Sequence, residues 1–175
     1  MKLFEFNPEK LNHVFTITNQ DLNKEAVLNI LNISNISLNE FAHELINSTS
    51  FDLGNLGTTT SIIELKLEDI GLNCGGSFSD IESAISNSNI SVCPIELGPY
   101  LRLKYNAQIE SKIFTKNQHP DESIVIFSKP IIRNDLYPKG FYLRNYDGKL
   151  WLRGYRCSED YIWNGKDRML FQYIP

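Results

Sequence analysis

The stretch that most constrains the fold is GFYLRNYDGKLWLRGY, residues 140–155, near the C-terminus. At its centre is the dipeptide Asp147-Gly148, which suits a type I′ turn because both central residues of that turn need positive φ. On both sides of the dipeptide apolar and polar residues alternate, the period-two pattern of a strand with one buried face. The stretch therefore predicts a tight antiparallel hairpin. One face of this hairpin carries the apolar side chains Phe141, Leu143, Leu150 and Leu152.

Further strands are predicted in other parts of the chain: LFEF and HVFTI near the N-terminus, SIIELKL at 61–67, SIVIFSKPI at 123–131 and DRMLFQYIP at 167–175. The chain has 175 residues, of which 42% are hydrophobic and 22% charged, a composition typical of globular proteins. That length suits one domain, 1–175, with a core that needs no staples. Residues 1–60 are richer in predicted helix than the remainder.

Two helices are predicted near the N-terminus, at 21–31 and 37–47. The second begins with Ser37 and Glu40, whose spacing is that of a capping box. Because the link between these helices is short, we expect them to pack as a helical hairpin. A third helix, from about Asp80 to Ser86, has the same capping-box spacing at Ser79 and Glu82. The predicted fold class is α+β: an N-terminal helical hairpin and a mainly antiparallel β-sheet from the C-terminal half, in a single domain.

Residues 92–105, VCPIELGPYLRLKY, combine a corner with an alternating segment. Gly98 allows the backbone to reverse direction, and Pro99 cannot lie deep inside a helix. Beyond them, apolar residues alternate with Arg102 and Lys104, which favours a strand with one buried face. A helix that begins at Pro99 is the alternative, since proline is well tolerated in the first turn.

The segment CPIELGPYLRLKY also resembles a pattern, CPxExGPxLRLxY, of a family of small bacterial proteins of unknown function. The resemblance extends from about residue 64 to the C-terminus, where LEDIGLNCGGSFSDI, QHPDESIVIFSKPI, GFYLRNYDGKLWLRGY and DRMLFQYIP follow in the same order as the family's segments. The closing part includes the family's DGxLWL motif. Ile124 departs from the pattern, because the family favours tryptophan there. The resemblance implies a bacterial origin and brings no established activity or cofactor.

Charge and composition argue against several classes of function. The net charge is −4 and the pI is about 5.4, which gives no support for binding to duplex nucleic acid. No apolar run is long enough to span a membrane, and the N-terminus lacks the apolar region of a secretory signal. The three cysteines form no CxxC pair, so we expect buried thiols in a reducing cytoplasm. No cofactor is predicted, and the oligomeric state stays open.

Charged residues near the corner are the first candidates for a site. Glu96, Arg102 and Tyr105 bring a carboxylate, a guanidinium and a phenol into one short segment. Asp121 and Glu122 follow in NQHPDES, and one hypothesis is that they join these residues in a cleft that binds a polar ligand or performs acid–base chemistry. The structural alternative is an ion pair that fixes the corner. Because a metal site built on one histidine needs ligands from distant positions, no metal is predicted here.

The second candidate is the polar face of the hairpin, formed by Tyr142, Arg144, Trp151 and Arg153. Aromatic and arginine side chains are typical of protein interfaces, and they also stack on single-stranded bases. The same side chains can equally be part of the core. We therefore expect a non-enzymatic cytoplasmic binding or interaction module, and the candidate partner is another protein. The alternatives are a small-ligand-binding protein or enzyme with a charged cleft around Glu96, Arg102 and Glu122, and a single-stranded nucleic-acid-binding protein.

Overall fold

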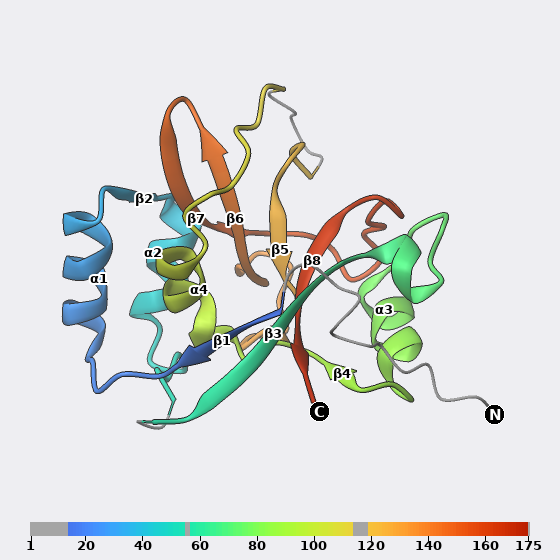
Figure 1. Cartoon of the computed structure of the whole chain (residues 1–175), viewed down its shortest axis with the longest axis horizontal. Helices are drawn as coiled ribbons and strands as arrows, with labels where there is room; N and C mark the ends of the chain where they lie inside the picture. The colour runs from blue at the N-terminus through green and yellow to red at the C-terminus, as the bar shows by residue number, and fades with distance from the viewer. Residues whose placement is uncertain (1–13, 55–56, 114–118, 175) are drawn as a thin grey trace.

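β-Strands form the centre of the molecule, and their order follows from the pairing of distant segments. A computed structural model describes residues 14–54, 57–113 and 119–174. The strands of these residues form one curled sheet in the order β1-β3-β8-β5-β6-β7-β2, and β4 also pairs with β8 (Figure 1). The strands are β1 (Val14–Thr18), β2 (Ile36–Leu38), β3 (Thr59–Lys66), β4 (Ile90–Ser91), β5 (Ile124–Ile126), β6 (Gly140–Tyr146), β7 (Lys149–Tyr155) and β8 (Arg168–Tyr173).

The mixed α and β character and the single domain are confirmed, and the sheet is mainly antiparallel. Only the pairs β5–β8 and β2–β7 are parallel among the described strands. Most of the described strands, β4 to β8, lie in the C-terminal half as predicted, and β1 to β3 join them from the N-terminal half. The predicted strand HVFTI corresponds to β1, whereas LFEF lies outside the described residues.

Helices cover both faces of the sheet. They are α1 (Lys24–Ile33), α2 (Glu40–Asn47), α3 (Phe78–Ile85) and α4 (Gly98–Lys104), with short 3₁₀ turns η2 (Leu67–Ile70) and η3 (Ile95–Leu97). Figure 1 shows α1, α2 and α4 together at one side of the molecule and α3 at the other. Within the described ranges, no helix combines the length and the apolar character needed to cross a membrane.

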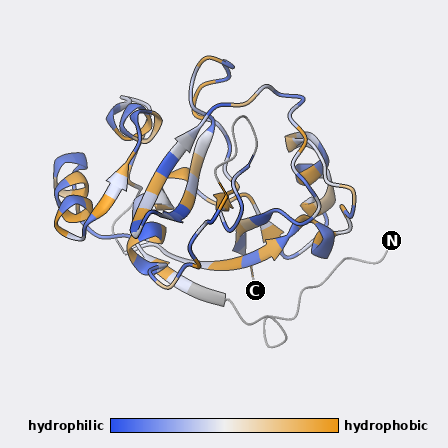
Figure 2. Cartoon of the chain, turned by 90° about the horizontal axis from the view of Figure 1, so that it is seen from above, coloured by the Kyte–Doolittle hydropathy of each residue, from blue (hydrophilic) through white to orange (hydrophobic). Residues whose placement is uncertain are grey.

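Two hydrophobic cores lie on opposite faces of the sheet, because neighbouring residues of one strand point in opposite directions. The first core includes Ile62 and Leu170, and α1, α2 and α4 pack on it. The second core includes Ile63 and Phe171, with Ile81 of α3 among its members. Apolar and polar residues are interleaved along the helices and strands (Figure 2). Two-sided burial explains why β3 and β8 contain runs of adjacent apolar residues.

The predicted hairpin is confirmed as β6 and β7. Asp147 and Gly148 have φ values of 54° and 66°, the positive angles that a type I′ turn needs. Leu143 pairs with Leu152 on the face of the first core. The opposite face has the register Tyr142 opposite Arg153 and Arg144 opposite Trp151.

The helices at 21–31 and 37–47 are present as α1 and α2, but the expected helical hairpin is not shown. The link between them contains β2, which pairs in parallel with β7 at the edge of the sheet. Ser37 belongs to this strand and therefore does not cap α2. The cap is Asn39, whose side chain accepts a hydrogen bond from the backbone N–H of Ala42 at 3.0 Å.

The predicted capping box of the third helix is displaced toward the N-terminus. Ser77 and Asp80 form the box of α3, rather than Ser79 and Glu82. The Ser77 hydroxyl accepts from the Asp80 backbone, and the Asp80 carboxylate accepts from the Ser77 backbone. Both serines suit an N-cap, so spacing alone cannot choose between them.

The segment after the Gly-Pro corner is helical, so the predicted strand is wrong and the alternative holds. Pro99 lies in the first turn of α4, where a missing N–H costs nothing. Arg102 is fully buried in this helix, and the alternation that suggested a strand does not separate buried from exposed side chains as expected. Gly98 packs against the ring of Phe141, and a Cβ atom at Gly98 would lie 2.6 Å from it.

Candidate functional site

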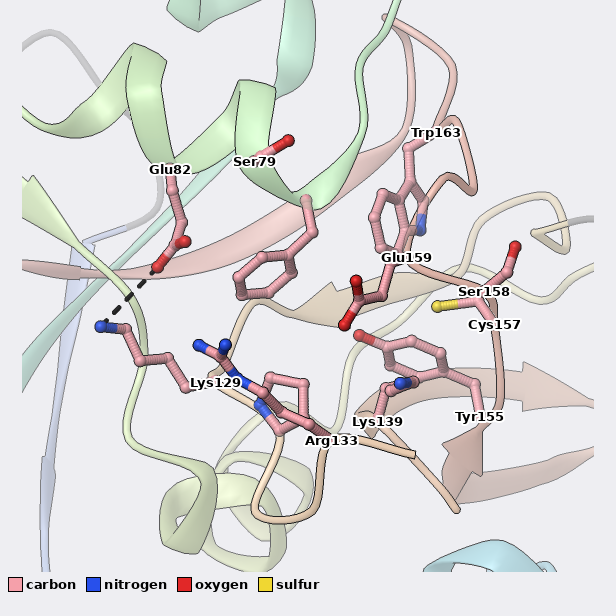
Figure 3. A pocket seen from close by; sticks show the side chains of 12 residues that line it. Ser79, Glu82, Lys129, Arg133, Lys139, Tyr155, Cys157, Ser158, Glu159 and Trp163 are labelled. Carbon is pink, nitrogen blue, oxygen red and sulfur yellow. Dashed lines mark ion pairs between the residues drawn. The ribbon is translucent and has the colours of Figure 1, made fainter. Parts of the chain in front are cut away.

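A pocket opens beside the first turn of α3, and we call it the α3 pocket (Figure 3). Its volume is about 340 Å³. Three separate parts of the chain form it: the start of α3, the segment that leads into β6, and the end of β7 with the loop that follows. The lining residues are Phe78, Ser79, Glu82, Lys129, Pro130, Arg133, Lys139, Tyr155, Cys157, Ser158, Glu159 and Trp163.

Aromatic rings form one wall of the α3 pocket, and packing holds them in place. Phe78 stacks on Phe127, a buried residue of the second core, with ring centroids 4.7 Å apart. Trp163 meets Tyr155 edge to face at 6.3 Å. Such pairs stabilise ring positions beyond the burial of apolar area. The wall is therefore part of the second core, and the protein's own packing holds its rings in place.

Three cations and two carboxylates line the same pocket. Lys139 is the most enclosed, with its side chain 7% exposed, and it donates to Asp135 at 2.9 Å. Its backbone N–H donates to the carbonyl of Tyr155, which fixes the residue at the start of β6. At one edge of the pocket, Lys129 and Glu82 are 3.8 Å apart (Figure 3).

Arg133 and Glu159 also line the α3 pocket, and both side chains are exposed. Neither forms an ion pair with another residue in the part of the chain that the structure describes. In Figure 3 the Glu159 side chain extends toward the Tyr155 ring, whereas the Arg133 side chain extends away from that ring, toward Lys129. The pocket thus contains one cation and one carboxylate that are free to meet a ligand.

The hydroxyl and thiol groups in the α3 pocket keep their protons at neutral pH. Burial raises the pKa of Tyr155, and the neighbouring Cys157 adds to the effect. Burial also raises the pKa of Cys157 to about 11, although the Lys139 ammonium acts in the opposite direction. A thiol in this state is a poor nucleophile, because the thiolate is the reactive form. Tyr155 is instead a hydrogen-bond donor, and its hydroxyl bonds to no other described residue.

The residues predicted at the corner do not form one cleft. Arg102 donates to Gln108 Oε1 at 2.7 Å and to the carbonyl of Trp151 at 3.3 Å, and it also bonds to the Tyr105 carbonyl. Burial lowers its pKa to about 10, which still leaves it charged at neutral pH. Glu96 lies instead beside the turn at Gly54. No ion pair joins Glu96 and Arg102 in the described structure.

Tyr105 and Glu122 do come together, through a partner that the sequence did not indicate. Arg168 of β8 bonds to Glu122 at 3.2 Å, to the Tyr105 hydroxyl at 3.2 Å and to Glu64 of β3 at 2.6 Å. Tyr105 in turn donates to Glu64 at 2.6 Å. Burial and this hydrogen bond raise the pKa of Tyr105 to about 12. The group is a closed network of paired charges across two strands.

Asp121 is separate from this network and fixes the loop after α4. Its carboxylate accepts from the Ser111 hydroxyl at 2.6 Å and from two backbone N–H groups. Burial alone would raise the pKa of Asp121, but these hydrogen bonds outweigh it and lower the pKa. A shallow second pocket of about 450 Å³ lies against Asp121, Glu122 and Arg168. Because Arg168 is already paired twice, this second pocket offers no free guanidinium.

The polar face of the hairpin is covered in part by the chain itself. Arg144 is buried, and it donates to the Ser111 hydroxyl at 3.1 Å and to the Ile113 carbonyl at 3.2 Å. The other three side chains of this face, Tyr142, Trp151 and Arg153, are half-buried. Arg153 donates to the Tyr142 hydroxyl at 2.8 Å, and its guanidinium lies 5.0 Å from the centre of the Trp151 ring. These side chains hold one another in place, and a loop rather than a helix covers the face.

Metal-binding and cysteine chemistry find little support among the described residues. No group of three or more His, Cys, Asp or Glu side chains there can hold a metal ion. Burial lowers the pKa of His119, which lies on a backbone carbonyl at 3.3 Å. All three cysteines are free, but only Cys93 is buried: Cys74 is exposed and Cys157 half-buried, contrary to the expectation.

Comparison with protein-family models, curated proteins and solved structures finds no match to this chain. The resemblance to a bacterial family of unknown function is therefore still a prediction from the sequence. Function has to be argued from the geometry of the sites.

Proposed function

We propose that this protein is a non-enzymatic binding module of the bacterial cytoplasm, and that the α3 pocket is its binding site. The observation that carries the proposal is a pocket with an aromatic wall and unpaired charged groups. Binding sites for small molecules are typically concave and largely apolar, with a few polar groups that orient the ligand. The α3 pocket shares the concave shape and has an aromatic wall, but seven of its twelve lining residues are polar or charged, so it suits a ligand with charged or hydrogen-bonding groups.

Protonation in the α3 pocket favours binding over catalysis. A general base works best with a pKa near the operating pH, and a cysteine nucleophile needs a thiolate. Tyr155 and Cys157 have raised pKa values and stay neutral. Both groups therefore act as hydrogen-bond donors or as surface for packing, not as proton acceptors.

The alternative sites are less suited to a ligand because their groups are already occupied. Arg102 is fully buried among protein acceptors, and Glu96 lies elsewhere. On the hairpin face, Arg153 is engaged by Tyr142 and Trp151. A protein partner or a single-stranded nucleic acid would have to displace these contacts, whereas Arg133 and Glu159 of the α3 pocket have no ion-pair partner in the described structure to give up.

Titration of the full chain with small aromatic compounds tests this proposal. We would screen neutral, anionic and cationic one- and two-ring compounds by ¹H–¹⁵N NMR and map the shifted resonances. Shifts should concentrate on residues that line the α3 pocket, including the Trp163 indole. The variant Ser79→Trp, which places a large ring at the exposed rim, should reduce binding.

The matched control is Ser83→Trp, which adds the same ring to an exposed position of α3 that does not line the pocket. It should bind as the unaltered protein does. The proposal would be abandoned if compounds of every charge left the pocket resonances unshifted, or if both tryptophan variants bound equally well.

A further inference from the structure

We infer that the α3 pocket selects a small planar ligand that carries an oxyanion group such as a carboxylate, a sulfonate or a phosphate. The inference rests on the proposed function and specifies its ligand class. It follows from the donors on the pocket floor, the sign of the charge around them, and the shape of the aromatic wall.

The first reason is that two donor groups in the pocket can each donate a further hydrogen bond. The Lys139 ammonium has three N–H groups, and its partner in the described structure is the single exposed carboxylate of Asp135. The Tyr155 hydroxyl lines the same pocket and bonds to no other described residue. Both groups can therefore donate a further hydrogen bond into the pocket, and an oxyanion would accept a charge-assisted one from each.

The sign of the local charge is the second reason. The whole chain has a net charge of −4, yet cations outnumber carboxylates among the pocket residues. Arg133 has no carboxylate partner in the described ranges and can reach a ligand from the rim. Lys129 is held loosely, because 3.8 Å from Glu82 is a long contact for an ion pair. Asp135 offsets the charge of Lys139, so the unpaired Arg133 is the cation that gives the rim of the pocket its positive potential.

The size and walls of the pocket define the body of the ligand. A volume of about 340 Å³ lies at the small end of known ligand pockets, which span roughly 300–1,000 Å³. Phe78 and Trp163 offer ring surfaces on which a planar group can pack. One or two fused rings with a single acidic group match this combination.

Glu159 allows a test of the charge of the ligand. It is the one carboxylate of the pocket lining without an ion-pair partner in the described structure, so it should repel an oxyanion. Removing its charge should strengthen the binding of an anion and weaken that of a cation. A pocket that recognises only apolar surface would show neither change.

The experiment uses three probes with the same ring system: 2-naphthalenesulfonate, 2-naphthalenemethanol and 2-naphthylmethylammonium. Their dissociation constants would be measured by calorimetry on the full chain, with NMR to place each probe. We expect the sulfonate to bind about tenfold more tightly than the alcohol, as one charge-assisted hydrogen bond allows, and the ammonium to bind most weakly.

Three variants then identify the groups responsible. Arg133→Gln and Lys139→Met should each weaken sulfonate binding about five- to tenfold and alcohol binding by a smaller factor, because a neutral hydroxyl is the weaker acceptor. Glu159→Gln should strengthen sulfonate binding. Lys149→Gln, at an exposed position outside the pocket, is the control and should change nothing. Because Arg133 and Glu159 are exposed, their variants should fold even if Lys139→Met does not.

Equal binding of the sulfonate and the alcohol at the pocket would overturn the inference while the proposed function survived. The inference would also fall if Glu159→Gln weakened the binding of the sulfonate, or if Arg133→Gln left it unchanged. Absence of binding for all three probes would overturn the inference and the proposed function together.

Discussion

At the scale of single residues, the charges that the sequence marked as functional turn out to organise the fold. Arg102 is a fully buried guanidinium that reaches Gln108 and the carbonyls of Arg144 and Trp151. It therefore ties α4 to both strands of the β6–β7 hairpin. Because the guanidinium is fully buried, its hydrogen bonds fix the position of α4 and its charge is out of reach of a ligand.

Tyr105 should make stability depend on alkaline pH. Burial and the hydrogen bond to Glu64 raise its folded-state pKa to about 12, while a tyrosine in the unfolded chain titrates near 10. The folded state therefore holds the proton more tightly, and the resulting stabilisation is complete below about pH 10. It should be lost as the pH rises from about 10 to 12.

The measurement is the free energy of unfolding in urea between pH 8 and pH 12, for the unaltered chain and for Tyr105→Phe. The phenylalanine variant lacks the titrating group, so the difference between the two proteins isolates it. That difference should shrink above about pH 10. A difference that stays constant across this range would show that Tyr105 has the same pKa in the folded and unfolded states.

At the scale of elements, the sequence predicts what local chemistry decides. The β6–β7 hairpin is correct in turn type and register because Asp147-Gly148 and the alternation on each side act within a few residues. The alternation after Pro99 predicted a strand where the structure has helix α4, because five alternating residues fit a strand or a short helix equally well. The helix is stabilised by Arg102, which donates hydrogen bonds to carbonyls of β6 and β7. These strands are distant in the sequence, so no pattern within α4 predicts that contact.

Strand β2 could not be predicted from the sequence for a similar reason. Its three residues lie between two well-patterned helices, and they form a strand only because β7 is available as a parallel partner. This pairing brings α2 against β7. Close approach there depends on Gly154, because a Cβ atom at that position would lie 2.5 Å from the backbone of Phe41.

Asn39 should contribute more to stability than an ordinary helix cap. Its Oδ1 accepts from the Ala42 and Gly154 backbones, and its Nδ2 donates to the Gly154 carbonyl at 2.9 Å, so one side chain caps α2 and joins it to β7. Asn39→Ala should lower the free energy of unfolding by about 2–3 kcal/mol. Asn39→Asp keeps the acceptor and loses the donor, so its cost should be intermediate.

Asn23→Ala is the matched control, since Asn23 caps α1 through one exposed hydrogen bond to Ala26. It should cost about 1 kcal/mol. Urea denaturation of the three variants measures the order. If Asn39→Ala were no more destabilising than Asn23→Ala, the link between α2 and β7 would carry no net stability.

At the scale of the whole molecule, the α3 pocket could not be predicted from the sequence. Its walls come from the start of α3, the segment before β6 and the residues after β7, which are adjacent only once the sheet has formed. None of these segments carries a motif that marks a site. Glu96 and Arg102 show the opposite: they are close in the sequence, yet they form no ion pair with each other in the described structure.

The two cores should unfold together, although they contain different residues on opposite faces of the sheet. Ile62 and Ile63 are adjacent on β3, yet one belongs to the first core and the other to the second, and Leu170 and Phe171 divide in the same way on β8. Loss of either core would expose the strands that carry the other. We therefore expect one cooperative transition rather than two.

Cys93 and Trp163 report the two cores independently. Cys93 is buried in the first core, and burial raises the pKa of its thiol, so it should react only after unfolding. Trp163 belongs to the second core and is the only tryptophan left in a Trp151→Phe variant. In urea, pulse labelling of Cys93, located by mass spectrometry, should have the same midpoint as the fluorescence change of Trp163. Exposed Cys74 should label at every urea concentration, and labelling of Cys93 while Trp163 fluorescence is still native would mean that the first core opens alone.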